Sequence, residues 1–353
     1  MAFASGYFKT SYAGDLAIVE TSARWIGLMV LLTALTFLPL LGSPFLVDLA
    51  NQVFLALIGS VALMLLTGYA GQISLGHAGF VAAGAFTTGI LVKELQAPIW
   101  LTLPASGIVG AALGIFFGLP SLRLKGLYLA LSTLALHFIV IYVGAEYETK
   151  RGFATGIVLE PPHLGPFVLQ DPSAWYFVLL IASLLVIILA VNIVRSRTGR
   201  AWMAIRDRDV AAAAFGIKVS GYKLSAFVVS SVLTSISGSL FAYYQGFVSA
   251  EAFSLFLTIQ YIAMVIIGGL GSILGAVLGT LFVVLLPYSI DFIMDQFSMP
   301  SRLTTYMFAV KQSSFGLIMI LFLILEPAGL VGLWTRIRDY FLLWPFKYRT
   351  QRG

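Results

Sequence analysis

The residues best suited to binding chemistry lie in one glycine-rich stretch of a very apolar chain, "GYAGQISLGHAGF" at residues 68–80. Gln72, Ser74 and His77 offer hydrogen bonds there, and the surrounding glycines weaken or break a helix. One interpretation is a broken membrane helix whose ends hold the carboxylate or ammonium group of a polar zwitterionic solute. The alternative is a tightly packed glycine-rich crossing in which Ser and Gln bond to neighbouring helices.

A second group of chemically active residues lies in "AWMAIRDRDVAAAAFGI" at residues 201–217. Charges followed by alanines predict a short helix of about 10–12 residues, and Gly216 predicts its end. Small residues would let this helix dock in a groove on a partner, with ion pairs giving orientation. The alternative is an amphipathic helix lying on the membrane. The expected apolar side comprises Ala204, Ile205, Ala211, Ala212 and Phe215, and the expected exposed side Arg206, Asp207, Arg208 and Asp209.

Motifs for catalysis and cofactor binding are missing from the sequence. It contains no cysteine, and His77, His137 and His163 lie too far apart to suggest a metal site. No phosphate-binding G-x-x-x-x-G-K-[ST], H-E-x-x-H or G-x-S-x-G occurs. "GLGSILG" at 269–275 resembles a dinucleotide fingerprint with its last gap one residue too long, and we interpret it as close helix packing within a span. An intramembrane enzyme is therefore the least favoured class.

The composition predicts the elements that must position these residues. The chain is 59% hydrophobic and 10% charged, whereas soluble domains carry about 25% charged residues. We therefore expect an all-α integral membrane protein. A crossing helix needs about 20 mainly apolar residues, and about ten segments qualify, centred on roughly 25–41, 50–67, 77–92, 99–119, 126–144, 174–194, 223–244, 256–269, 273–289 and 313–333. Glycine-punctuated stretches at 68–86 and 268–284 suggest two related halves with broken or short helices.

The basic residues predict the orientation. With a cytoplasmic N-terminus and ten crossings, sixteen of the 21 Lys and Arg residues fall on the cytoplasmic side. The net charge of +6 thus reflects topology and lipid headgroups, not nucleic acid. The expected plan is a cytoplasmic segment 1–24, a transmembrane domain 25–335, a basic cytoplasmic tail 336–353, an external loop 145–173 and a cytoplasmic loop 195–222.

Ionisable residues are scarce within the predicted spans. Glu326 is the clearest, and it lies near a predicted cytoplasmic end, where a boundary role is expected. Ion-driven carriers usually have charged groups at their core. The scarcity therefore predicts that energy comes from another source.

Four blocks in this order resemble the M-type membrane subunit of branched-chain amino-acid ABC importers, often called LivM. They are "TGYAGQISLGHAGFVAAGAF" (67–86), "LRLKGLYLALSTLA" (122–135), "GRAWMAIRDRDVAAAAFGI" (199–217) and "GGLGSILGAVLG" (268–279), and the resemblance covers roughly residues 50–335. It implies a permease that forms the pathway with a homologous H-type permease in a bacterial inner membrane. It also implies two cytoplasmic ATPase subunits and an extracytoplasmic solute-binding protein as partners, with ATP bound by the partners and no cofactor in this chain.

The resemblance also suggests roles for individual residues. The 199–217 block matches the coupling loop that docks on the ATPase, which suggests Arg206, Asp207, Arg208, Asp209, Ala212 and Gly216 as coupling residues. Gln72, Ser74 and His77 are the candidates for the substrate pathway.

One stretch departs from the family pattern. Where relatives show a "TGG-x-x-GL"-like external sequence, this chain reads "TKRGFATGI" at 149–157. Because a binding protein would dock on that face, urea, short amides and aromatic acids stay open as solutes beside branched-chain amino acids. A stand-alone channel or facilitator for a small polar solute is the alternative from another class.

Overall fold

Helices make up nearly all of the described structure. A computed structural model describes residues 22–122, 126–153, 156–164, 167–296, 307–326 and 328–343. Within these ranges seven helices are long and apolar enough to cross a membrane, and three shorter helices are also apolar. The all-α membrane class is therefore confirmed, and each of the ten predicted segments overlaps a helix.

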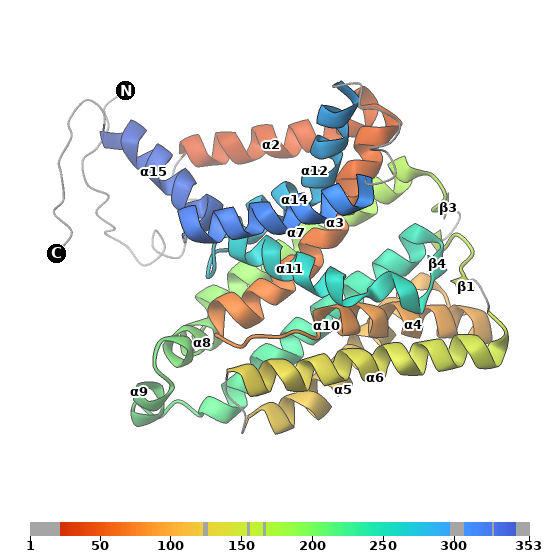
Figure 1. Cartoon of the computed structure of the whole chain (residues 1–353), viewed down its shortest axis with the longest axis horizontal. Coiled ribbons are helices and arrows are strands. Elements are labelled where there is room, and N and C mark those ends of the chain that lie inside the picture. The colour runs from red at the N-terminus through yellow and green to blue at the C-terminus, as the bar shows by residue number, and fades with distance from the viewer. Residues whose placement is uncertain are drawn as a thin grey trace.

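The helix bundle has two distinct ends (Figure 1). The short helices α8 (Arg197–Asp207) and α9 (Asp209–Ala214) mark one end, called here the α8 end. Short antiparallel strands mark the opposite end of the bundle, called here the strand end. There β1 pairs with β4 and β2 pairs with β3. The strands are β1 (Ile157–Val158), β2 (His163–Leu164), β3 (Phe167–Val168) and β4 (Phe247–Val248).

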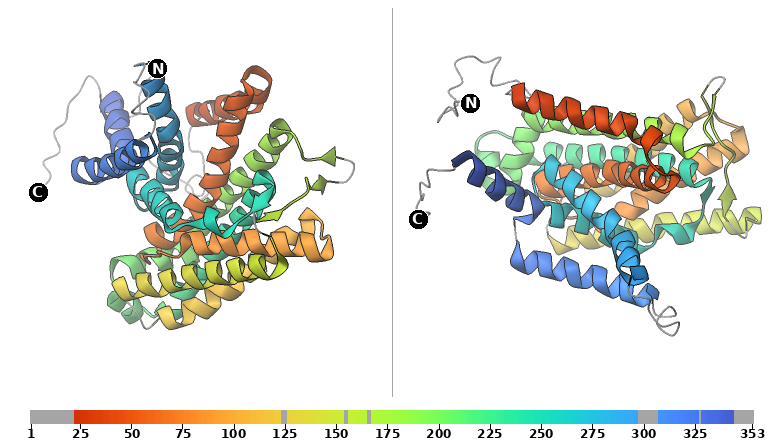
Figure 2. Two further views of the ribbon diagram at one scale, coloured as in Figure 1. Left: turned by 45° about the vertical axis from the view of Figure 1, so that its right-hand side comes forward. Right: turned by 90° about the horizontal axis from the view of Figure 1, so that it is seen from above.

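Long helices connect these two ends. They are α2 (Ser22–Leu41), α3 (Pro44–Leu63), α4 (His77–Leu95), α5 (Ile99–Ser121), α6 (Leu127–Arg151), α7 (Pro172–Arg195), α10 (Val219–Gln245), α12 (Ile273–Gln296) and α14 (Met307–Leu325). Helix α3 continues into a π-helical turn, η1 (Met64–Tyr69). Figure 2 shows α4, α5 and α6 side by side on one flank of the molecule.

Glycines allow helices α4, α5 and α10 to pack very closely. A Cβ atom at Gly84 of α4 would lie 1.8 Å from the Ser235 carbonyl oxygen of α10. A Cβ atom at Gly114 of α5 would lie 2.1 Å from the Ser231 hydroxyl, which also belongs to α10. Hydrogen bonds reinforce the contact, since the Ser235 hydroxyl donates to the Phe80 carbonyl oxygen at 3.0 Å. The core of the protein therefore forms around α10.

Two helices begin inside the bundle. Residues 70–76 are irregular between η1 and α4. Helix α11 (Leu255–Gly268) follows the 3-10 turn η2 (Ala250–Phe253) and, with 14 residues, rises only about 21 Å. Their first turns meet, because the Ala78 amide donates to the Thr258 hydroxyl at 3.0 Å. The structure thus contains the short and interrupted helices that the sequence suggested.

Two predicted segments need correction. Helix α14 ends at Leu325, and a separate helix α15 (Gly329–Leu343) follows, so 313–333 is not one span. The chain turns there through Gly329, whose φ is +67°. "GLGSILG" at 269–275 is not the interior of a span: residues 269–272 form the turn between α11 and α12, with φ of +113° at Gly269 and +79° at Gly271, and residues 273–275 begin α12. Close packing is nevertheless present, since a Cβ atom at Gly279 would lie 1.8 Å from the Met264 carbonyl oxygen.

Candidate functional site

The three predicted pathway residues are all buried near the interrupted helix. Gln72, Ser74 and His77 are 4%, 1% and 1% exposed. The Gln72 amide donates to the Lys223 carbonyl oxygen at 2.9 Å, and the Ser74 hydroxyl accepts from the Gly76 amide at 3.3 Å. Their hydrogen bonds therefore stabilise the irregular segment itself.

His77 connects three helices at the first turn of α4. Its Nε2 lies 2.9 Å from the Gly59 carbonyl oxygen, near the middle of the helix formed by α3 and η1. Its ring also meets the Tyr261 ring of α11 edge to face, with centroids 4.8 Å apart. His77 thus supports a residue that lines the central cavity.

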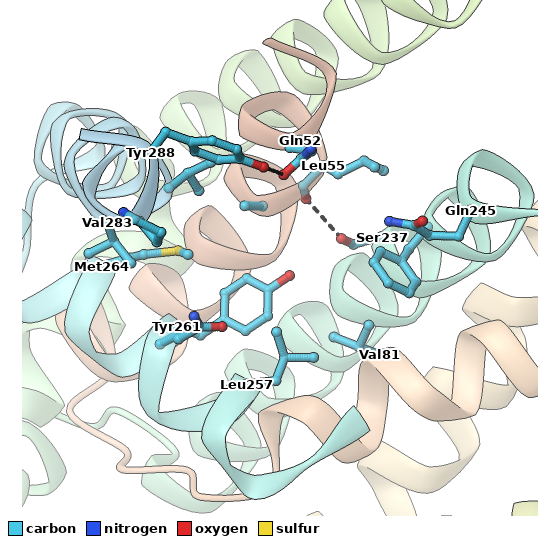
Figure 3. Close-up of a pocket in the computed structure, with 15 residues that line it drawn as sticks. Gln52, Leu55, Val81, Ser237, Gln245, Leu257, Tyr261, Met264, Val283 and Tyr288 are labelled. Atoms are coloured by element: carbon cyan, nitrogen blue, oxygen red, sulfur yellow. Dashed lines mark hydrogen bonds between the residues drawn. The ribbon is translucent and has the colours of Figure 1, made fainter. Parts of the chain in front are cut away.

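The central cavity lies between α3, α4, α10, α11 and α12 and has a volume of about 260 Å³ (Figure 3). This volume is slightly below the range of roughly 300–1,000 Å³ that is usual for ligand pockets. None of the three predicted pathway residues lines it, so their contact with a solute stays a prediction. The polar residues that line it are Gln52, Ser237, Gln245, Gln260, Tyr261 and Tyr288. The apolar residues are Leu55, Ala56, Val81, Phe241, Leu257, Met264, Val283, Val284 and Pro287.

One wall of the cavity is a chain of hydrogen bonds. The Tyr288 hydroxyl donates to Oε1 of Gln52 at 2.8 Å, and Nε2 of Gln52 donates to Oδ2 of Asp48 at 2.8 Å. The Tyr244 hydroxyl donates to the other carboxylate oxygen, Oδ1. This wall combines neutral polar groups with a carboxylate in the first turns of α3, near the strand end of the bundle.

The residues of this wall were not predicted from the sequence. The available signal was "VDLANQ" at 47–52, which places Asp48, Asn51 and Gln52 three and four residues apart, on one face of an otherwise apolar helix. Glu326, which was singled out instead, forms an ion pair with Arg336 of α15. Its place at the end of α14 agrees with the boundary role expected for it.

The segment 195–222, predicted to contain one short helix, contains two, α8 and α9. The helix is interrupted at Arg208, whose backbone is extended at φ −156° and ψ 103°. As predicted, Gly216 ends the second helix, with φ +82° and its amide bonded to the Ala213 carbonyl oxygen at 2.9 Å. Because the break turns α9 relative to α8, Phe215 and Ala211 are exposed and not on the buried side.

The residues of this segment differ widely in their exposure to solvent. Ile205 and Ala212 are buried at 4% and 3% exposure, whereas Val210 and Phe215 are exposed at 77% and 87%. Asp207 and Arg208 are exposed, and Asp209 pairs with Lys223 at 3.6 Å. The accessible surface of α9 is therefore apolar, with valine, alanine and phenylalanine side chains.

Arg206 is exposed, as predicted, and pairs with Asp207 at 3.1 Å, but its guanidinium also joins three elements. Its Nη1 donates to the Gly68 carbonyl oxygen of η1 at 2.7 Å. A Cβ atom at Gly271, in the turn between α11 and α12, would lie 2.9 Å from the same nitrogen. Gly68 and Gly271 also touch, since a Cβ atom at Gly68 would lie 2.7 Å from the Gly271 amide nitrogen. The two glycine-rich stretches thus meet at Arg206.

A bundle of apolar helices with a cavity between them and an exposed helix pair at one end is the architecture of a polytopic membrane protein. The family described as "Branched-chain amino acid transport system / permease component" matches residues 45–326. The chain belongs to this family and is a membrane permease component.

Several curated relatives are similar over most of their length. The high-affinity branched-chain amino acid transport system permease protein LivM of Salmonella typhimurium is 32% identical over 294 residues, which cover 76% of this chain and 68% of the relative. LivM of Escherichia coli is 31% identical with the same coverage. The autoinducer 2 import system permease protein LsrC of Klebsiella pneumoniae is 28% identical over 55% of each chain. No solved structure matches.

Proposed function

We propose that this chain is the transmembrane permease subunit of an ATP-binding-cassette importer for branched-chain or related amino acids. The central cavity carries the proposal. It places amide and hydroxyl groups, suited to the polar end of an amino acid, beside leucine, valine and methionine side chains suited to an alkyl group. The two LivM relatives support the same solute class.

The energy would come from partner subunits. The sequence has no phosphate-binding loop motif, and the exposed α9 offers a surface on which two cytoplasmic ATPase subunits and this permease could couple. A homologous second permease would complete the pathway, and an extracytoplasmic binding protein would deliver the solute at the strand end. The membrane would be the bacterial inner membrane, with both termini cytoplasmic.

The solute assignment is tested in the assembled importer. We expect leucine, isoleucine or valine to stimulate ATP hydrolysis and to accumulate in proteoliposomes that contain the ATPases, the second permease and the binding protein. Stimulation by urea, a short amide, an aromatic acid or autoinducer 2 instead would reassign the solute. Flux down a gradient in liposomes containing this chain alone would favour the stand-alone facilitator.

The docking surface is tested on α9. Phe215→Asp should prevent co-purification of the ATPase subunits, because it places a charge where an exposed aromatic ring would otherwise be buried in the partner. Val158→Asp at the strand end, which changes a 58% exposed residue, is the control and should leave assembly intact. Equal recovery of the ATPase with both variants would contradict docking through Phe215.

A further inference from the structure

We propose that Asp48, which does not itself line the cavity, orients the cavity wall so that it accepts hydrogen bonds from a positively charged ammonium group of the solute. The inference rests on the proposed function, because it assigns a chemical role to one wall of the same cavity. It adds a residue that determines which end of a zwitterion this wall recognises.

The first step is the orientation of the Gln52 amide. A carboxylate can only accept hydrogen bonds, so Gln52 must direct its NH₂ group toward Oδ2 of Asp48, 2.8 Å away. The carbonyl oxygen of Gln52 is then directed to the Tyr288 hydroxyl, also at 2.8 Å. Asp48 thereby determines that the Gln52 nitrogen faces the carboxylate and the Gln52 oxygen faces Tyr288.

The second step concerns Tyr288, which lines the cavity. Its hydroxyl has one hydrogen, and that hydrogen is used in the bond to Gln52. The lone pairs of its oxygen are the remaining hydrogen-bonding capacity. Tyr288 therefore presents an acceptor to the cavity, and Figure 3 shows its hydroxyl directed toward Gln52.

The third step is the charge behind this wall. Both carboxylate oxygens of Asp48 accept from neutral donors, Gln52 and Tyr244. Within the described part of the chain, no Lys or Arg forms an ion pair with Asp48. Because Asp48 is only partly exposed on a membrane helix, its negative charge is weakly screened and attracts a cation into the cavity.

The rest of the cavity complements this arrangement. The amides of Gln245 and Gln260 line it and have no hydrogen-bond partner among the described residues, so they can donate to a carboxylate. An ammonium near Tyr288 and a carboxylate near these amides would orient a zwitterionic amino acid. A carboxylic acid without an amine would meet acceptors and a negative charge at one end.

The test compares three ligands of similar shape that differ in charge: leucine, leucinamide and 4-methylpentanoate. Binding is measured on the assembled transporter in nanodiscs without the binding protein, so that the affinity belongs to the permease. We expect the wild-type complex to bind leucine and leucinamide at least tenfold more tightly than 4-methylpentanoate. Asp48→Asn, which can donate as well as accept, should reduce this preference at least tenfold.

Two further variants make the result specific. Tyr288→Phe removes the acceptor without changing Asp48 and should reduce the same preference, which keeps the test informative if Asp48→Asn fails to fold. Asp171→Asn removes an exposed carboxylate at the strand end, at the start of α7, and should change nothing.

The outcomes separate the two hypotheses. A wild-type complex that prefers leucine, with the preference unchanged in folded Asp48→Asn and Tyr288→Phe, would overturn the role of Asp48 and leave the proposed function standing. A wild-type complex that binds neither amine-bearing ligand would overturn both.

Discussion

At the scale of single residues, glycines determine how closely the central helices approach. Gly84 shows the effect most directly, because its α-carbon faces the backbone of α10 with no room for a methyl group. Backbone carbonyls cannot move aside as a flexible side chain can. Gly84 is therefore a packing contact, and so are Gly76 and Gly79 of the stretch that suggested a binding motif, whose Cβ atoms would lie 2.2 Å and 2.7 Å from backbone atoms of α6.

Gly84→Ala should destabilise the protein by about 1–3 kcal/mol, the usual cost of overpacking a tight core. The cause is the clash with the Ser235 carbonyl oxygen. Gly107→Ala in α5 is the matched control, because its Cβ atom would lie at an ordinary 3.5 Å from the nearest atoms. Thermal melting in detergent should show a lower Tm for Gly84→Ala alone, and equal Tm values would refute the clash.

The helix break could be predicted from single residues, but the residues that line the cavity could not. Glycines around Gln72, Ser74 and His77 correctly indicated a break in the helix, because backbone preference is local. Which polar groups face a cavity depends on the packing of distant helices, so Tyr288 and Gln52 meet 236 positions apart. A single sequence contains no signal for that pairing.

At the scale of elements, two side chains join α8 to the cavity helices: Trp202, whose Nε1 donates to the Tyr222 carbonyl oxygen of α10 at 3.0 Å, and Arg206. The Arg206 guanidinium binds the Gly68 carbonyl oxygen near the C-terminal end of η1, where a helix presents unpaired carbonyl groups and partial negative charge. A π-helical turn is a frequent feature of functional sites. Motion of α8 would therefore reach α3 and the turn between α11 and α12.

Arg206→Gln should uncouple ATP hydrolysis from transport. Hydrogen bonds to charged groups contribute about 1.5–3 kcal/mol, so a loss of roughly tenfold in uptake per ATP hydrolysed is expected if this bond transmits the motion of α8. Arg197→Gln, which changes an exposed arginine at the start of α8 that is not among the candidate coupling residues, should keep normal coupling. Uptake and ATP hydrolysis are measured together in proteoliposomes, and unchanged stoichiometry in Arg206→Gln would exclude this role.

Element boundaries were predictable where composition changes sharply. Hydropathy located the spans, and Gly216 marked the end of α9. The break at Arg208 was not predictable, because arginine and aspartate are both compatible with a helix and tertiary contacts decide the direction of α9. The end of α14 at Leu325 was missed because "PAGLVGL" continues the apolar run beyond it.

At the scale of the whole molecule, the two ends of the bundle differ in charge. The described residues at the α8 end include the basic Arg195, Arg197, Arg200, Arg206, Arg208, Lys218 and Lys223 and the acidic Asp207 and Asp209, whereas those near the strand end include the acidic Glu94, Glu146, Glu148, Glu160, Asp171 and Glu251 and the basic Lys93, Lys150 and Arg151. Because cytoplasmic segments are rich in Lys and Arg, the α8 end should face the cytoplasm. The same orientation is needed for α9 to reach an ATPase.

The orientation can be measured directly, because the natural chain contains no cysteine. Ser220→Cys at the α8 end and Val158→Cys at the strand end each place one thiol at an exposed position. In intact cells, a maleimide reagent that passes the outer membrane but not the inner one should label Val158→Cys only. Permeabilising the inner membrane should then expose Ser220→Cys, and each variant serves as the control for the other. The opposite pattern would place α9 outside the cell and would rule out its coupling to a cytoplasmic ATPase. Cavity binding would be unaffected by that result, so the labelling experiment tests the energy source separately from the solute.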